Sequence, residues 1–403
     1  MKSRHTLATA MALAASFAVA GGAPAQTTIK LGVLNDQSSL YADLSGQGSV
    51  VAAKMAIEDS GIEKRGFKIE VISADHQNKA DLGSSISRQW IDVEKVDAIV
   101  DVPNSGVALA VNQITKDKNK VFLVSGAASS ELTGAQCSPN TVHWAYDTWA
   151  LANGTGKAIV KTGGDSWFFL TADYAFGQAL ERDTEAVVAA NGGKVLGKVR
   201  HPLNTSDFSS FLLQAQASKA KVIGLANAGG DTTNAIKQAA EFGIVAGGQS
   251  LAGLLVFVTD VHALGLKTAQ GLILTEAFYW DRDDASRAFA KRFAPQFKNI
   301  MPSMVHAGVY GAVLHYLKAV EAAKGAGDGA AVVAQMKALP TDDPLFGRGT
   351  VRVDGRHIHP MYLFEVKKPD ESKGPWDYYK VRATIPAEEA FRPLDKGGCA
   401  LVK

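Results

Sequence analysis

The chain has 403 residues, of which 46% are hydrophobic and 20% charged, and its formal net charge is +2. This length exceeds what one hydrophobic core comfortably serves and favours two domains. A net charge so close to zero argues against nucleic acid or an anionic membrane surface as the main partner.

The N-terminal segment has the layout of a secretory signal peptide. Lys2 and Arg4 precede an apolar run over residues 7–20, and a small-x-small cleavage pattern ends at Ala25. A membrane-spanning helix is the alternative, but it needs about 20 apolar residues, and this run stops at Gly21. We therefore predict that residues 1–25 are removed after Ala25 and that the product is periplasmic. Outside the cytoplasm NAD(P)H and ATP are not supplied, which weighs against most α/β enzymes.

The next part of the chain alternates strand-like and helix-like segments. Strands are predicted over residues 29–34, 67–73, 98–102 and 121–124, and helices over 48–60, 81–93 and 108–117. This alternation indicates a parallel sheet covered by helices on both faces.

A second series follows a Gly- and Thr-rich break near residues 147–164. Its predicted strands are 167–170, 193–199, 222–226 and 271–274, and its predicted helices are 176–191, 208–219 and 233–242. Two long helices (286–297 and 307–324), a further helix after the loop 325–329, and two strands (349–353 and 361–366) come later. The chain thus contains two similar α/β lobes and a late group of elements still to be assigned.

In parallel α/β sheets, ligands bind beyond the carboxyl ends of the strands, so the loops at these ends are the candidate site. In the first series one long polar loop carries Tyr41. Two small-residue loops contain Asn104-Ser105-Gly106 and Ser125 to Ser130. Backbone N–H groups, hydroxyls and a helix N-terminus together suit an anion such as a carboxylate or a phosphate. The alternative is a pair of ordinary tight turns with Ser caps.

The second series places aromatic rings at its strand ends. The loop 171–177 contains Tyr174 and Phe176, and the loop 227–232 contains Asn227 and Asp231. The run Phe278-Tyr279-Trp280 is expected to be either core beneath a loop or a wall of the ligand site.

No catalytic constellation is recognisable. The Gly46-x-Gly48 pair lies too far past its strand for a dinucleotide fingerprint, and no phosphate-binding lysine motif or serine nucleophile elbow is present. His357 and His359 would share one strand face; without a third ligand we interpret them as a surface strand. His143 and His306 stand alone, although His306 could reach the cleft. We expect no enzymatic activity, no cofactor and no metal.

Cys137 and Cys399 are the only cysteines. An even pair in an exported protein most simply forms one disulfide, the alternative being two unpaired buried thiols. A bridge would hold the tail 386–403 to the first lobe.

Taken in order behind a signal peptide, these motifs resemble the type I solute-binding proteins of ABC importers, the group related to the leucine/isoleucine/valine-binding protein. The resemblance runs from Ile29 to about Val366. It rests on the opening strand with its Ser/Gly loop and on the runs 125–133, Asp173 to Gly177 and 227–232. It implies an α/β fold of two Rossmann-like lobes with parallel central sheets joined by three crossovers. Lobe 1 would comprise residues 26–146 and 278–348, and lobe 2 residues 147–277 and 349–385.

The resemblance also implies a ligand between the lobes. Amino-acid binders of this family hold the α-carboxylate in the two small-residue loops; here Ala128 takes the place of the usual Thr, with Ser129 beside it. The ammonium group normally meets an acid in lobe 2, but the corresponding region 251–256, which includes Leu254, has none, and only Asp231 could replace it. Burying an unpaired ammonium is unfavourable.

We therefore expect a monomer that binds a small carboxylate, preferably an aromatic or other organic acid, and delivers it to an inner-membrane ABC permease. Binding of branched-chain or other amino acids, and ligand sensing for a membrane receptor, are the alternatives. The candidate ligand-binding residues are Tyr41, Asn104, Ser105, Ala127, Ala128, Ser129, Tyr174, Phe176, Asn227, Asp231 and Leu254.

Overall fold

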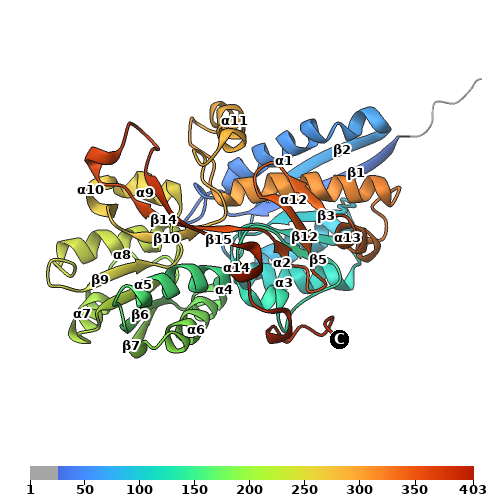
Figure 1. Ribbon diagram of the computed structural model, residues 1–403. Helices are drawn as coiled ribbons and strands as arrows, with labels where there is room; N and C mark the ends of the chain where they lie inside the picture. Colours follow the sequence, from blue (N-terminus) through green and yellow to red (C-terminus); the bar gives the residue numbers. More distant parts are fainter. Residues whose placement is uncertain (1–25) are drawn as a thin grey trace, which may run out of the picture.

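The structure, a computed structural model, describes residues 26–403, and the predicted signal peptide lies outside this range. Two α/β lobes stand side by side (Figure 1). Over the described residues no helix combines the length and the apolar character that crossing a bilayer requires.

Lobe 1 is built on a five-stranded parallel sheet with the order β2-β1-β3-β4-β5. Its strands are β1 (Thr27–Asn35), β2 (Phe67–Asp75), β3 (Ala98–Asp101), β4 (Val121–Val124) and β5 (Thr141–His143). Every residue of the central strands β3 and β4 is buried, as expected for β-branched and apolar strands covered on both faces. The register aligns Leu34, Asp101, Val124 and His143, so the loops that follow these four strands meet at one edge.

Helices cover both faces of this sheet, and two of them come from the late part of the chain. They are α1 (Gly46–Ser60), α2 (Ala80–Asp92), α3 (Ser105–Asp117), α12 (Met304–Ala322) and α13 (Gly329–Ala338). Helix α1 ends at Gly61, whose left-handed backbone (φ 61°) stops the helix. Helix α12 packs along α1 (Figure 1), and α11 (Asp284–Phe293) also contacts α1.

Lobe 2 repeats the plan with a four-stranded parallel sheet in the order β7-β6-β8-β9. The strands are β6 (Ser166–Ala172), β7 (Lys194–His201), β8 (Val222–Ala226) and β9 (Ser250–Gly253). The helices are α4 (Thr148–Leu151), α5 (Lys157–Lys161), α6 (Ala175–Ala190), α7 (Ser209–Ala217), α8 (Gly229–Glu241), α9 (Val258–Leu264) and α10 (Leu266–Ala269), and a π-helical turn joins α4 to α5.

The late strands form two small antiparallel sheets. One has the order β10-β14-β15, with β10 (Ile273–Glu276), β14 (Met361–Val366) and β15 (Tyr379–Ile385), and its apolar residues join the core of lobe 2. The other has the order β11-β12-β13, with β11 (Thr341–Asp343), β12 (Gly347–Val351) and β13 (His357–Ile358). Arg356 bridges to His143 at the end of β5. We therefore propose that the last lobe boundary lies near residue 360 rather than 349, because β12 and β13 pack with lobe 1.

Several local expectations need correction. The short strands β5 and β9 are absent from the sequence prediction, and residues 251–253, interpreted as loop, belong to β9. Helices α3 and α8 begin earlier than predicted, so Asp231 lies in the first turn of α8. The surface-strand interpretation of His357 and His359 is wrong: both are fully buried, and the His357 ring stacks on Trp144 with centroids 3.9 Å apart.

Two other questions are settled by packing. The run Phe278-Tyr279-Trp280 is core: Phe278 is buried, and the Tyr279 hydroxyl and the Trp280 indole N–H both donate to the Trp376 carbonyl. The disulfide between Cys137 and Cys399 is present, with a Cα–Cα distance of 5.5 Å.

Candidate functional site

A narrow cavity lies between the lobes, where the loops after the parallel strands of both sheets face each other. Its walls come from lobe 1, from the first crossover and from lobe 2. The lining residues are Tyr41, Leu44, Pro103, Gly126, Ala128, Tyr146, Tyr174, Phe176, Ala228, Leu255 and Phe257. No acidic or basic side chain is among these residues of the described chain, so the walls are aromatic and apolar with a few hydroxyl and backbone groups.

The lobe 1 end of the cavity is held in shape by polar contacts within its two small-residue loops. The Asn104 side chain caps α3 by accepting from the N–H groups of Gly106 and Val107. The Ser105 hydroxyl accepts from the Ser129 N–H at 3.2 Å. Within residues 26–403, no protein acceptor meets the N–H groups of Ser105, Ala127 or Ala128. Free N–H groups beside a helix N-terminus are the donors that an anion needs.

Tyrosine hydroxyl groups form hydrogen bonds at the cavity, and one of these bonds joins the two lobes. The Tyr41 and Tyr174 oxygens lie 2.5 Å apart, and the Tyr146 hydroxyl donates to the Gly126 carbonyl at 2.6 Å. Burial raises the pKa of all three tyrosines, so their hydroxyls stay protonated at neutral pH. Phe257 packs edge-on against Tyr146 and completes the aromatic wall.

Three buried carboxyl groups lie behind this wall. Asp231 accepts from the N–H groups of Asn204 and Thr205, and burial raises its pKa to about 6. Asp260 accepts from the Phe257 N–H, and burial raises its pKa to about 7. Glu276 accepts from the Tyr379 hydroxyl, and burial holds its pKa well above the usual value.

Polar contacts between the lobes hold them together around the cavity. Arg182 on α6 donates to Glu131 at 2.7 Å. Next to it, the Ser130 hydroxyl donates to Asp183 at 2.7 Å. With the tyrosine pair, these contacts define a closed arrangement of the lobes.

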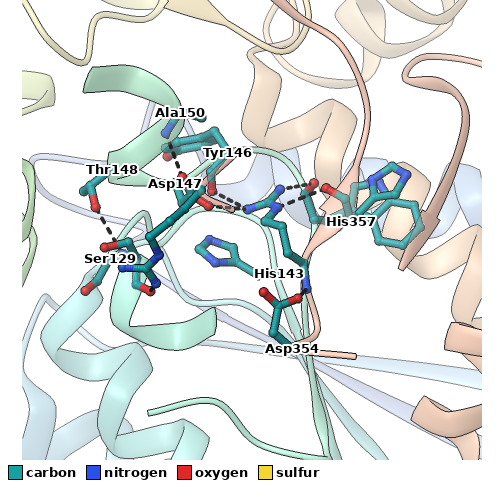
Figure 2. A network of polar contacts seen from close by, with 12 residues as sticks. Ser129, His143, Tyr146, Asp147, Thr148, Ala150, Asp354 and His357 are labelled. Carbon is teal, nitrogen blue, oxygen red and sulfur yellow. Dashed lines mark hydrogen bonds and ion pairs between the residues drawn. The ribbon is translucent and has the colours of Figure 1, made fainter. Parts of the chain in front are cut away.

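The hinge beside the cavity is organised by one buried guanidinium. Arg356, in the third crossover, donates to the carbonyls of Trp144, Tyr146 and His357 at 2.5, 2.9 and 3.0 Å. Its Nη1 also lies 3.6 Å from the Asp147 carboxylate. Figure 2 shows Tyr146, Asp147 and His357 gathered at this junction of the first and third crossovers. Burial lowers the pKa of Arg356 to about 10, so it remains charged at neutral pH.

The predicted site residues fall into two groups. Tyr41, Ala128, Tyr174 and Phe176 line the cavity. The others lie behind the lining, where they shape loops or the core: Asn104, Ser105, Ala127, Ser129, Asn227, Asp231 and Leu254. Their contact with a ligand stays a prediction.

His306 does not line the cavity; its Nε2 contacts the Ser45 carbonyl at 2.8 Å, which ties α12 to the start of α1. The described residues contain no group of three or more His, Cys, Asp or Glu side chains placed to hold a metal ion.

Sequence reasoning missed several lining residues, chiefly Tyr146, Leu255 and Phe257. Tyr146 follows β5, and Leu255 and Phe257 follow β9. Because these two strands are very short, their ends carried no recognisable pattern. Gly126 and Ala228, in contrast, belong to loops that the sequence analysis had already selected because they follow parallel strands.

The sequence and the structure of this chain are similar to those of known proteins. The model of the periplasmic binding protein family matches residues 28–374. A crystal structure of a periplasmic binding protein from Burkholderia mallei is 57% identical, with a TM-score of 0.90, and the match covers 93% of this chain and 99% of that one.

A branched chain amino acid ABC transporter periplasmic ligand-binding protein from Burkholderia xenovorans LB400 is 42% identical, with a TM-score of 0.82, over 93% of this chain and all of that one (100%). The Leu/Ile/Val-binding protein homolog 6 of Brucella melitensis is 26% identical over 371 residues, which cover 90% of this chain and 93% of the relative.

Proposed function

The chain belongs to the periplasmic binding protein family as a substrate-binding protein of an ABC transporter rather than an enzyme, and on this premise we propose that it binds a small organic carboxylate with a planar or apolar body. The single observation that carries the proposal is the cavity between the lobes, whose walls are aromatic and whose lobe 1 end offers free N–H groups. The ligand would then pass to an inner-membrane permease.

The two ends of the cavity support two kinds of contact. A carboxylate at the lobe 1 end would accept charge-assisted hydrogen bonds from the N–H groups of Ser105 and Ala128, which are stronger than bonds between neutral groups. The body of the ligand would pack between Tyr174, Phe176 and Phe257, where aromatic rings supply apolar area and specific edge or face contacts.

Size and charge both favour a small acid. The closed lobes leave only a narrow space between the lining residues, which favours a small ligand over a larger one. Of the three carboxyl groups behind the wall, Asp260 and Glu276 have raised pKa values, so neither imposes a full negative charge beside an anionic ligand at pH 7. Asp231, with a pKa of about 6, is mostly ionised at that pH, and its carboxylate is held by the N–H groups of Asn204 and Thr205. A ligand ammonium, in contrast, finds no carboxylate among the lining residues.

Closure of the lobes strengthens both contacts because it excludes water from the cavity. Tyr41 and Tyr174 meet across the opening, so the closed lobes would sequester the ligand. A binder of this kind releases its ligand only after the lobes separate, and it makes and breaks no covalent bond.

Binding of a branched-chain or other amino acid is the second candidate. Asp231 lies near the hydroxyls of Tyr41 and Tyr174, whose pKa values are raised by burial first and, to a smaller extent, by the Asp231 charge. A small shift of α8 would bring its carboxylate to a ligand ammonium. Ligand sensing for a membrane receptor would use the same cavity and is a question of partner, not of ligand.

A thermal-shift screen followed by calorimetry tests the proposal. Benzoate and leucine represent the two ligand classes, and benzyl alcohol keeps the ring of benzoate without its carboxylate. We expect benzoate-like acids to raise the melting temperature and benzyl alcohol to leave it unchanged, since a ligand at 100 times its Kd stabilises by about 2.7 kcal/mol. If benzyl alcohol matches benzoate, the anion site is wrong; if leucine binds better than any aromatic acid, Asp231 becomes the ammonium partner.

A further inference from the structure

The tail, residues 386–403, connects the two lobes a fourth time. It leaves β15 in the lobe 2 sheet, and the Asn153 amide donates to its Glu389 carbonyl at 2.7 Å. Its far end is bonded through Cys399 to Cys137 in lobe 1. Figure 1 shows α14 (Ala387–Ala390) between the lobes and the C-terminus beside lobe 1. Because both ends are held, the tail has a defined path across the hinge.

On this path the tail contacts the loop that forms the anion end of the cavity. The Arg392 Nη2 donates to the Ser130 carbonyl at 2.9 Å. Arg352, in the third crossover, donates to the Arg392 carbonyl, also at 2.9 Å. Phe391 lies under the Arg356 guanidinium at 4.4 Å, which places the start of the contact on the hinge. Arg392 is therefore oriented by the hinge and directed at Ser130.

Ser130 joins three other parts of the molecule to this contact. Its N–H donates to the Thr148 hydroxyl at the start of α4, at 3.1 Å. Its hydroxyl donates to Asp183 on α6, in lobe 2. It follows Ala128 and Ser129 directly in the chain, and its side chain is fully buried. Any displacement of Ser130 would therefore shift the N–H groups of the ligand loop.

The fit between tail and loop is tight enough to require a glycine. A Cβ atom at Gly134 would lie 2.6 Å from the Arg392 Nη2 and 2.9 Å from the Gly397 carbonyl oxygen. These close approaches by themselves leave no room for a side chain at this position. The tail and the loop 130–134 thus fill a common volume.

We propose that Arg392 is a positioning residue for the ligand: held by the disulfide-anchored tail, it fixes Ser130 and thereby keeps the loop 126–130 in its binding geometry. The inference rests on the proposed function, because that loop forms the proposed carboxylate site. Its physical basis is preorganisation, since a loop that is already ordered loses less conformational entropy when the ligand binds.

Amide hydrogen exchange without ligand tests the positioning role directly. The variants are Arg392→Met, which keeps the apolar stem, the pair Cys137→Ser with Cys399→Ser, and the triple variant. We expect exchange over residues 126–134 to accelerate at least tenfold in Arg392→Met and in the cysteine pair, and the triple variant to exceed neither. Arg382→Met, which breaks an exposed ion pair with Glu365, is the matched control and should leave this segment unchanged.

Affinity for benzoate supplies the second readout. Arg392→Met should raise the Kd roughly three- to tenfold with little change in melting temperature, and Arg392→Lys, which retains a donor, should restore part of the loss. Unchanged exchange in Arg392→Met, or effects of the arginine and cysteine changes that multiply in the triple variant, would overturn the inference. If benzoate binds none of the proteins, the proposed ligand class fails, and the exchange data still decide the role of Arg392.

Discussion

Replacing Arg356 by Met should destabilise the protein severely, because the guanidinium holds two crossovers together. It donates to the carbonyls of Trp144, Tyr146 and His357 and faces the Asp147 carboxylate. Each hydrogen bond from a charged donor contributes about 1.5–3 kcal/mol. The loss of these hydrogen bonds is offset in part, because the variant no longer has to bury a charged guanidinium when it folds. Removal of one partner from a buried ion pair typically costs about 3–5 kcal/mol. We expect a loss in that range.

Urea unfolding followed by both far-UV circular dichroism and tryptophan fluorescence measures this loss, and the two probes reveal whether the lobes still unfold together. Arg382→Met is a suitable control because Arg382 lies exposed on β15, where an ion pair contributes about 0–1 kcal/mol. Arg356→Lys should fall between the two, since an ammonium cannot reach three carbonyls in one plane. If Arg356→Met loses less than about 1 kcal/mol, the reasoning is refuted, and packing rather than the Arg356 contacts stabilises the hinge.

Three further predictions concern the cavity, the disulfide and a buried histidine. Replacing Tyr174 by Ala should weaken benzoate binding by about 1–3 kcal/mol, the range for one well-packed aromatic anchor, whereas Phe242→Ala, on the surface of lobe 2, should leave the Kd unchanged in calorimetry. Replacing Cys137 and Cys399 by Ser should lower the free energy of unfolding by at most about 5.6 kcal/mol, the loop-entropy limit for a closed loop of this length; an unreduced, unfolded wild type that releases thiols in a titration would contradict the bridge. Burial lowers the pKa of His306 to about 4, so the unfolded chain takes up a proton first as the pH falls through about 6.5. Stability should therefore be complete above that pH and decline towards pH 4, by about 3 kcal/mol from this group, and His306→Gln should flatten the decline in urea melts at successive pH values.

The expectation that ligands bind beyond the carboxyl ends of parallel strands, called here the strand-end rule, located much of the site from sequence because it depends on regular elements. Strands β3, β4, β6 and β8 are apolar runs between helices, and their following loops supplied Ala128, Tyr174 and Phe176. The rule failed where the strand was too short to leave a pattern, as with β5 before Tyr146 and β9 before Phe257.

Burial of polar residues was the other gap. Arg356, His357 and His359 carry charge or polar groups that usually indicate a surface, and only tertiary partners such as the Trp144 ring and three backbone carbonyls make their burial favourable. No local pattern encodes partners so distant in the chain. Asp260 was overlooked for a similar reason: its carboxyl group is bound by the Phe257 N–H of its own helix cap, and its closeness to the cavity arises only from the fold.

The packing of α1 against α12 joins two segments that lie far apart in the chain, and this affects the order in which the protein can fold. In a chain exported as residues 1–25 predict, N-terminus first, residues 27–143 emerge early, and the face of α1 that packs on α12 has no partner until residues 304–322 follow. Cys137 likewise waits with a free thiol for Cys399, close to the C-terminus. Because the chain has only these two cysteines, oxidation within one molecule has a single possible product. The bridge between Cys137 and Cys399 therefore needs an oxidant but no isomerase to correct its pairing.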